Sequence, residues 1–148
     1  MSEQQDPSAR HAMEWDCQHA VTRMYRGVDE RKYEDCAAQF APDGVWHRQG
    51  KALAGRAAII AALNARTLTQ VTRHVLSNFV VSANQEGQAQ VDCYLHTYVH
   101  DSGQQETRPI VIDSPTRLLL VSAGMVNWQG QWRIAQLKTR PEFAFRTD

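Results

Sequence analysis

The segment at residues 88–100 constrains the fold of this chain more than any other. Polar or aromatic side chains alternate in it with mainly apolar ones, namely Asp92, Tyr94, His96, Tyr98 and His100 with Val91, Cys93, Leu95, Thr97 and Val99. A period of two residues is typical of a long β-strand whose two faces meet different surroundings. A second β-branched segment, 71–83, precedes it across a turn at 84–87, so the sequence predicts two consecutive antiparallel strands.

The first half of the chain is mainly helical in pattern. Apolar residues at helical spacing, or runs of strong helix formers, predict helices at 9–28, 33–40 and 56–67. One short strand is expected between the second and third helices, at 45–48. A turn at 42–44 and a loop at 50–55 are expected on either side of that strand.

The second half completes an α+β pattern. Strands at 116–128 and 131–139 are expected to form a hairpin around Gln129-Gly130. Helices followed by consecutive antiparallel strands are typical of the α+β class. The 148 residues are 43% hydrophobic, which excludes an intrinsically disordered chain and suits one core. We therefore expect a disordered N-terminus at 1–8 and a single domain at 9–148.

Charge and cysteine content limit the expected partners and location. Sixteen basic residues balance sixteen acidic ones, so no overall field favours nucleic acid or an acidic membrane as a partner. No apolar run reaches the ~18 residues of a membrane span, and the first residues lack the order of a signal peptide. Cys17, Cys36 and Cys93 have neither disulfide nor zinc spacing, so we expect buried, reduced thiols in a cytoplasmic protein.

Asp29 and His74 are the residues with the clearest chemical potential. Asp29 lies near the end of the first expected helix, and His74 lies in the strand at 71–83. A carboxylate that orients an imidazole makes the histidine a general base near neutral pH. Taken singly, His74 also fits a core histidine and Asp29 a solvated residue at a helix end. The fold decides whether the two meet.

The order of elements and several short pieces of sequence resemble the SnoaL-like, scytalone dehydratase-like branch of the nuclear transport factor 2-like superfamily. The pieces are VDER at 28–31, FAPDGVW at 40–46, GRAAI at 55–59, TRH at 72–74 with SN at 77–78, GQWRI at 130–134 and LKTRPEF at 137–143. The resemblance covers about residues 10–145. It implies a cone in which N-terminal helices pack on a curved antiparallel sheet around a pocket.

The resemblance also implies a chemistry. In lyases of this branch an aspartate at the end of the first helix pairs with a histidine on the sheet, and the matching residues here are Asp29 and His74. The histidine takes a proton from carbon without a metal or organic cofactor. The implied function is a lyase or isomerase acting on a small hydrophobic, cyclic molecule, in a homodimer or homotrimer. A non-catalytic ligand-binding or assembly domain is the alternative, because fold alone does not establish chemistry.

Other residues are candidates for the pocket. Tyr25 lies one helical turn before Asp29, so the two can share a face. By the resemblance, His47 matches a strand tyrosine at the leaving oxygen, and His100 roughly matches a second catalytic histidine. A one-residue change of register would move His100 to the opposite face, which could instead be a subunit interface. The remaining expected contacts and apolar walls are Trp15, Trp46, Leu76, Asn78, Met125 and Phe143.

Two departures from the family pattern bear on the substrate. The Ser and Asn that scytalone dehydratase supplies from its penultimate strand have no clean counterpart, and Ser122 is the nearest candidate. The dehydrochlorinase of this branch carries a lysine where this chain has Arg23 or Met24. We therefore expect a substrate that is neither scytalone nor a chlorinated cyclohexane.

Overall fold

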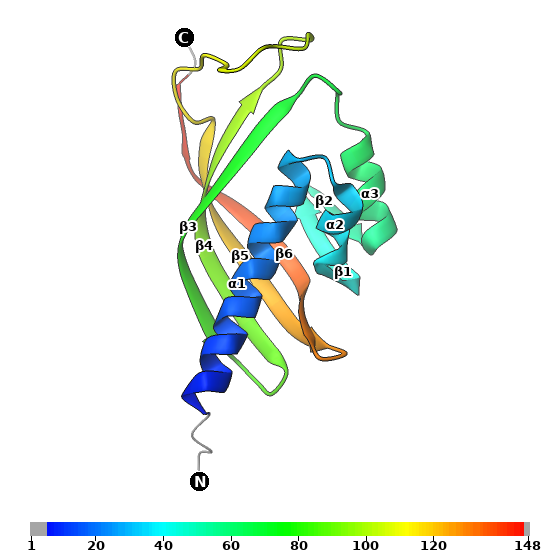
Figure 1. Cartoon of the computed structure of the whole chain (residues 1–148), viewed down its shortest axis with the longest axis vertical. Coiled ribbons are helices and arrows are strands. Elements are labelled where there is room, and N and C mark those ends of the chain that lie inside the picture. Colours follow the sequence, from blue (N-terminus) through cyan, green and yellow to red (C-terminus); the bar gives the residue numbers. More distant parts are fainter. Residues whose placement is uncertain (1–5, 147–148) are drawn as a thin grey trace.

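The computed structural model describes residues 6–146 of the chain (Figure 1). Its helices are α1 (Pro7–Asp29), α2 (Tyr33–Ala38) and α3 (Arg56–Asn64). Its strands are β1 (Phe40–Arg48), β2 (Lys51–Ala54), β3 (Val71–Ala83), β4 (Gln88–His100), β5 (Arg117–Trp128) and β6 (Gln131–Ala144). The α+β class expected from the sequence is confirmed. No helix in the described range has the length and apolar character needed to span a membrane.

The strands form one curved, open sheet in the order β2-β1-β6-β5-β4-β3 (Figure 1). Neighbouring strands are antiparallel except β1 and β6, which run parallel. The sheet is therefore mixed, which differs from the wholly antiparallel sheet that we expected. Local sequence patterns identify a strand but carry little information about the distant strand with which it pairs.

Helix α1 lies along the inner face of the sheet (Figure 1) and contacts β3, β4 and β6. Its buried residues recur every three or four positions, as one stripe: Met13, Cys17, Ala20, Val21, Met24, Tyr25 and Val28. They share one core with Val91 and Leu95 of β4 and with Ile134 and Leu137 of β6. Each large apolar side chain buried in this way contributes about 1.5–3 kcal/mol, which fixes α1 against the sheet.

The start of α1 lies slightly earlier than the sequence predicted. Pro7 occupies the first turn, where its missing N–H costs nothing, and the Asp6 carboxylate accepts a hydrogen bond from the Ser8 N–H at 3.2 Å. The helix therefore begins at Pro7 rather than near Ala9. Most of the N-terminal segment for which we expected disorder, residues 1–5, lies outside the described residues.

The region around β1 and β2 differs most from the sequence prediction. The expected turn at 42–44 is part of β1, where the register with β6 shifts between Phe40 and Val45. The expected loop at 50–55 contains strand β2. Gln49 and Gly50 both have positive φ, 53° and 74°, which is the geometry of a tight two-residue hairpin turn. That hairpin places the last residue of β1 opposite the first residue of β2.

Candidate active site

The end of α1 is held in a geometry that presents Asp29 to the sheet. The Lys32 N–H donates to the Gly27 carbonyl at 2.9 Å and the Arg31 N–H to the Val28 carbonyl at 3.3 Å, which is the Schellman pattern of helix termination. Arg31 occupies the left-handed position of this motif, with φ 58°, where glycine is usual. Asp29 is therefore the last residue of α1, at a fixed angle to the strands.

The Arg31 side chain connects this helix end to the chain just before β3. Its guanidinium donates to the carbonyl oxygens of Thr67 at 2.7 Å and Gln70 at 2.6 Å, and to the Tyr33 hydroxyl at 3.0 Å. Hydrogen bonds from a charged donor contribute about 1.5–3 kcal/mol each. They offset the left-handed backbone of Arg31 and hold the beginning of β3 beside the end of α1.

The Asp29 carboxylate accepts three hydrogen bonds from β3. The Thr72 hydroxyl donates at 2.9 Å, the His74 N–H at 2.8 Å, and the His74 ring Nδ1 lies 2.5 Å from Oδ1. The side chain of Asp29 is 7% exposed. The structure thus brings together the two residues that the sequence singled out, and it fixes the carboxylate in position through β3 itself.

The ring of His74 has one nitrogen committed and one available. Because a carboxylate only accepts, Nδ1 carries the proton in this contact, and in the neutral ring the lone pair is then on Nε2. Nε2 makes no hydrogen bond to any residue in the range 6–146. The side chain is 13% exposed and lines a cavity. This arrangement is that of a histidine prepared to accept a proton through Nε2.

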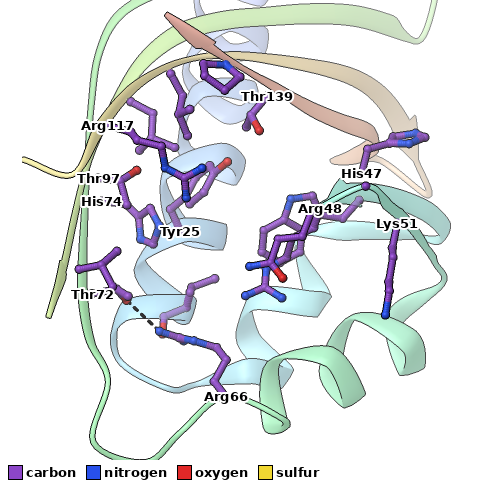
Figure 2. A pocket seen from close by; sticks show the side chains of 18 of the residues that line it. Tyr25, His47, Arg48, Lys51, Arg66, Thr72, His74, Thr97, Arg117 and Thr139 are labelled. Carbon is purple, nitrogen blue, oxygen red and sulfur yellow. Dashed lines mark hydrogen bonds between the residues drawn. The ribbon is translucent and has the colours of Figure 1, made fainter. Parts of the chain in front are cut away.

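A second arginine, Arg66, extends the network along the cavity wall. The Arg66 guanidinium donates to the Thr72 hydroxyl at 3.1 Å, and it also donates to the Val28 carbonyl, the Tyr33 hydroxyl and the Gln70 side chain. Figure 2 shows the bond between Arg66 and Thr72. Thr72 therefore links Arg66 to Asp29. The sequence reasoning missed both residues, although TRH at 72–74 was part of the family resemblance.

The cavity lies between the Asp29–His74 pair, here called the dyad, and the hairpin of β1 and β2 (Figure 2). Its volume is about 730 Å³. That size is within the usual range for a small-molecule site. Its apolar wall is formed by Val28, Trp46, Leu95, Val99, Leu119 and Pro141. Its polar wall includes Tyr25, Thr72, His74, Thr97 and Thr139.

Tyr25 lies beside His74, with a distance of 5.0 Å between ring centroids. Burial, followed by the neighbouring Cys93 and Cys36, raises the pKa of Tyr25 well above its ordinary value. The phenol therefore stays protonated at neutral pH. Its hydroxyl makes no hydrogen bond within residues 6–146, so it is available as a donor in the cavity that it lines.

Strand β4 lines the cavity with its odd-numbered residues, Leu95, Thr97 and Val99. His100 lies on the other face of the strand, where its Nε2 is 2.7 Å from a Glu106 carboxylate oxygen. Contrary to our expectation, the structure therefore does not place His100 at this cavity. The sequence already indicated this orientation. The apolar residues of this strand are at odd-numbered positions, whereas His100 is at an even-numbered position and so lies on the opposite face.

Five further expected pocket residues lie outside the cavity. Trp15 and Phe143 are 64% and 63% exposed. Met125 is buried in the core, and Leu76 is half-buried against it. Asn78 is exposed in a left-handed conformation, φ 55°, at an irregularity of β3. The spacing of apolar residues predicted burial or strand for most of these positions but did not distinguish the core from a cavity.

His47 lies at the rim of the cavity, but its ring does not face His74. Successive side chains of β1 alternate between faces, and Trp46 and Arg48 share the inner one. The ring Nε2 of His47 lies 2.8 Å from the Gln136 side-chain oxygen. The resemblance placed His47 near a leaving oxygen, and in this conformation its Nε2 is paired with Gln136 instead.

Basic side chains at the cavity were not expected from the sequence. Arg48, Lys51, Arg66 and Arg117 all line it (Figure 2), and no Asp or Glu does so among the described residues. The Arg48 guanidinium lies 5.5 Å from the ring centroid of Trp46. Burial, and then the charge of Arg66, lower the pKa of Arg48. The zero net charge of the chain hid this local excess of positive charge.

Comparison with known proteins agrees with the fold and the family resemblance. The profile of the SnoaL-like domain matches residues 9–138. A search of curated proteins finds no match. Similar solved structures include a scytalone dehydratase-like protein from Novosphingobium aromaticivorans, with 17% identity, a TM-score of 0.75 and coverage of 97% of this chain and 94% of that one.

Two other solved structures have the same fold. A type 2 hexachlorocyclohexane dehydrochlorinase is 14% identical, with a TM-score of 0.74 and coverage of 93% of this chain and 90% of that one. ActVI-ORFA from Streptomyces coelicolor is 16% identical, with a TM-score of 0.73 and coverage of 88% and 98%. At these identities the likeness establishes the fold and leaves the reaction to be argued from the site.

Proposed function

We propose, from the premise that the chain belongs to the SnoaL-like domain family, that it is a cofactor-independent lyase or isomerase. The observation that carries the proposal is the contact between Asp29 and His74 at the wall of a cavity large enough for a small cyclic molecule. A buried carboxylate that fixes one ring nitrogen, with the other free, is an arrangement suited to proton transfer.

The proposed reaction begins with the Nε2 lone pair of His74. A substrate C–H bond breaks, its proton moves to Nε2, and the electron pair stays on the substrate. In an elimination that pair expels the leaving group from the adjacent carbon, and the imidazolium gives its proton to the departing oxygen. In an isomerisation the imidazolium returns its proton to another carbon of the substrate. The Asp29 carboxylate stabilises the imidazolium formed in the first step. General-base assistance of this kind contributes about 10²–10⁴-fold in rate.

Tyr25 is the proposed partner for an oxygen of the substrate. Its hydroxyl is protonated at neutral pH, as an ordinary phenol is, and burial raises its pKa further. When a proton leaves a carbon next to a carbonyl group, negative charge develops on the carbonyl oxygen. A donor already positioned at that oxygen stabilises the transition state more than the ground state.

The test is elimination and isomerisation measured on a panel of cyclic β-hydroxy ketones and β,γ-unsaturated ketones, with and without a carboxylate substituent. Both reactions give conjugated enones, which absorb in the near ultraviolet. We expect turnover by the native protein and a loss of at least 100-fold in His74→Ala, with His96→Gln on the outer face of β4 unchanged. Turnover by His74→Ala equal to that of the native protein would contradict the proposal.

A non-catalytic binding domain is the competing function, and the same panel separates the two. Such a protein would bind members of the panel without converting them, and His74→Ala would alter affinity alone. The homodimer or homotrimer implied by the family resemblance stays a prediction, which light scattering on the purified protein would check.

A further inference from the structure

The charges around the cavity are unbalanced. Four cationic side chains line it, and no Asp or Glu does so within the described residues. The carboxylate of Asp29, behind His74, is already bonded to Thr72 and His74. A concave site with one sign of charge concentrates ligands of the opposite sign. The imbalance therefore bears directly on which molecules enter.

Arg66 adds to the positive charge at the cavity, but its hydrogen-bond donors are used inside the protein. They satisfy the Val28 carbonyl, the Tyr33 hydroxyl, the Gln70 side chain and Thr72. Arg66 thus has a structural task, which is to hold the end of α1 against the start of β3. Its charge remains, but its hydrogen-bond donors are not free for a ligand.

Arg48 and Lys51 have no such task. They are direct cross-strand partners in the hairpin of β1 and β2, and like charges in this position repel. Neither makes a hydrogen bond or ion pair with any residue from 6 to 146. Arg48 is half-buried over Trp46, where loss of water and the charge of Arg66 both disfavour its cationic form. An anion in the cavity would relieve this repulsion.

Thr97 gives a second, independent indication of a polar ligand. It is 5% exposed, it lines the cavity, and its hydroxyl has no hydrogen-bond partner among the described residues. A buried hydroxyl without a partner costs free energy that a ligand oxygen can recover. Figure 2 shows Thr97 on the wall that carries His74, with Arg48 and Lys51 across the cavity.

We propose that Arg48 and Lys51 form an anion subsite, and that the substrate carries a carboxylate held there while His74 faces the carbon from which the proton is taken. This inference rests on the proposed function, because it describes the molecule on which the dyad acts. A planar guanidinium binds a carboxylate through two parallel hydrogen bonds, and Lys51 adds a point charge. Thr97 contacts a further oxygen of the same molecule.

The subsite changes the expected substrate from a neutral hydrophobic molecule to a cyclic carboxylate. The apolar wall still suits a ring, so one end of the substrate is apolar and the other is charged. Fixed cations also stabilise the negative charge that develops on the substrate when its proton leaves. Arg48 and Lys51 would then bind the substrate from one wall of the cavity, and His74 would abstract the proton from the opposite wall.

The test compares two probes of nearly equal shape, 2-naphthoate and the neutral 2-naphthamide, by calorimetry and by the tryptophan fluorescence of the native protein. We expect naphthoate to bind at least tenfold more tightly at low salt, with the difference shrinking as NaCl is raised. Arg48→Gln and Lys51→Gln should each remove most of that preference. Arg140→Gln and Lys138→Gln, on exposed positions of β6, are the matched controls and should keep it.

Lys51 is exposed, so its variant tests the subsite even where Arg48→Gln destabilises the fold. Equal affinities for the two probes, no binding of either, or no effect of Lys51→Gln would overturn the inference. Tenfold tighter binding of 2-naphthyl phosphate than of naphthoate would overturn the assignment to a carboxylate. Turnover by His74→Ala tests the proposed function separately, because the preference for naphthoate over naphthamide is measured on the native protein and on the variants of Arg48 and Lys51.

Discussion

Both hydrogen-bond donors of one residue, the backbone N–H and the ring Nδ1 of His74, meet the carboxylate of Asp29, at 2.8 and 2.5 Å. The two contacts fix the position of the ring relative to its own strand as well as to α1. A ring held in this way cannot rotate to present Nδ1 to the cavity. The free nitrogen is therefore always Nε2, which is the property on which the proposed chemistry depends.

Asp29→Asn should lower the rate of proton abstraction by about 10²–10⁴-fold, because the amide cannot stabilise an imidazolium as the carboxylate does. The side-chain NH₂ of the new asparagine would also face the Thr72 hydroxyl and the two His74 donors, which in the native protein all donate to the carboxylate. The measurement is turnover of the enone-forming panel, with the ring tautomer of His74 followed by ¹⁵N NMR. Asp35→Asn, at an exposed position of α2, serves as the control. Unchanged turnover and tautomer in Asp29→Asn would contradict this role.

Thr72→Val should destabilise the fold by about 1–3 kcal/mol, because it removes one hydrogen bond each from the part-buried Arg66 and Asp29 side chains. Turnover should fall less than in Asp29→Asn, since both bonds from His74 to the carboxylate remain. Urea unfolding gives the free energy, and Thr107→Val in an exposed loop is the control. A Thr72→Val protein as stable as the native one would show that the link from Arg66 to Asp29 carries little energy.

Gly27→Ala should destabilise the protein, although alanine is the better helix former by about 1 kcal/mol. An added Cβ would lie 2.8 Å from the Cβ of Cys36 and 2.9 Å from its backbone nitrogen, so α1 and α2 would have to separate. Overpacking of this kind costs about 1–3 kcal/mol. Thermal unfolding is the measurement. Gly124→Ala is the control, because its Cβ meets only the Gln136 Cβ at 3.8 Å, and a more stable Gly27→Ala would contradict the close packing.

The three cysteines predict how stability depends on alkaline pH. Burial raises the pKa of Cys17, Cys36 and Cys93 from 9.0 to about 12. In the unfolded chain the thiols lose protons near pH 9, whereas the folded protein keeps them, so the free energy of unfolding should fall as pH rises from 9 toward 12. Urea unfolding at pH 8 and pH 10 measures the slope. Cys93→Ala should reduce it, and an equal slope in that variant would contradict the assignment.

Much of the fold was available from the sequence because its signals are local. The alternation over 88–100 identified β4, and the helical stripe that ends near Asp29 identified α1. The SnoaL-like resemblance added the pairing of Asp29 with His74, which neither segment specifies alone. Asp29 and His74 lie 45 positions apart in the sequence, and only the fold brings them into contact.

The cationic wall could not be predicted in the same way. Arg48 and Lys51 become cross-strand partners through a hairpin at Gln49-Gly50, and the sequence suggested only a loop there. The expected strand at 45–48 already put Arg48 on the same face as Trp46, but the sequence did not show that this face lines a cavity. Arg66 was hidden because its partners are mostly backbone carbonyls and hydroxyls rather than carboxylates.

The most direct test of the central claim is a double-mutant cycle on the dyad, with turnover measured for Asp29→Asn, His74→Ala and the combined variant. If the carboxylate acts through the imidazole, the combined variant should be no slower than His74→Ala alone, because Asp29 has no separate role once the base is absent. Losses that multiply across the two sites, or a His74→Ala protein with native turnover, would contradict the account.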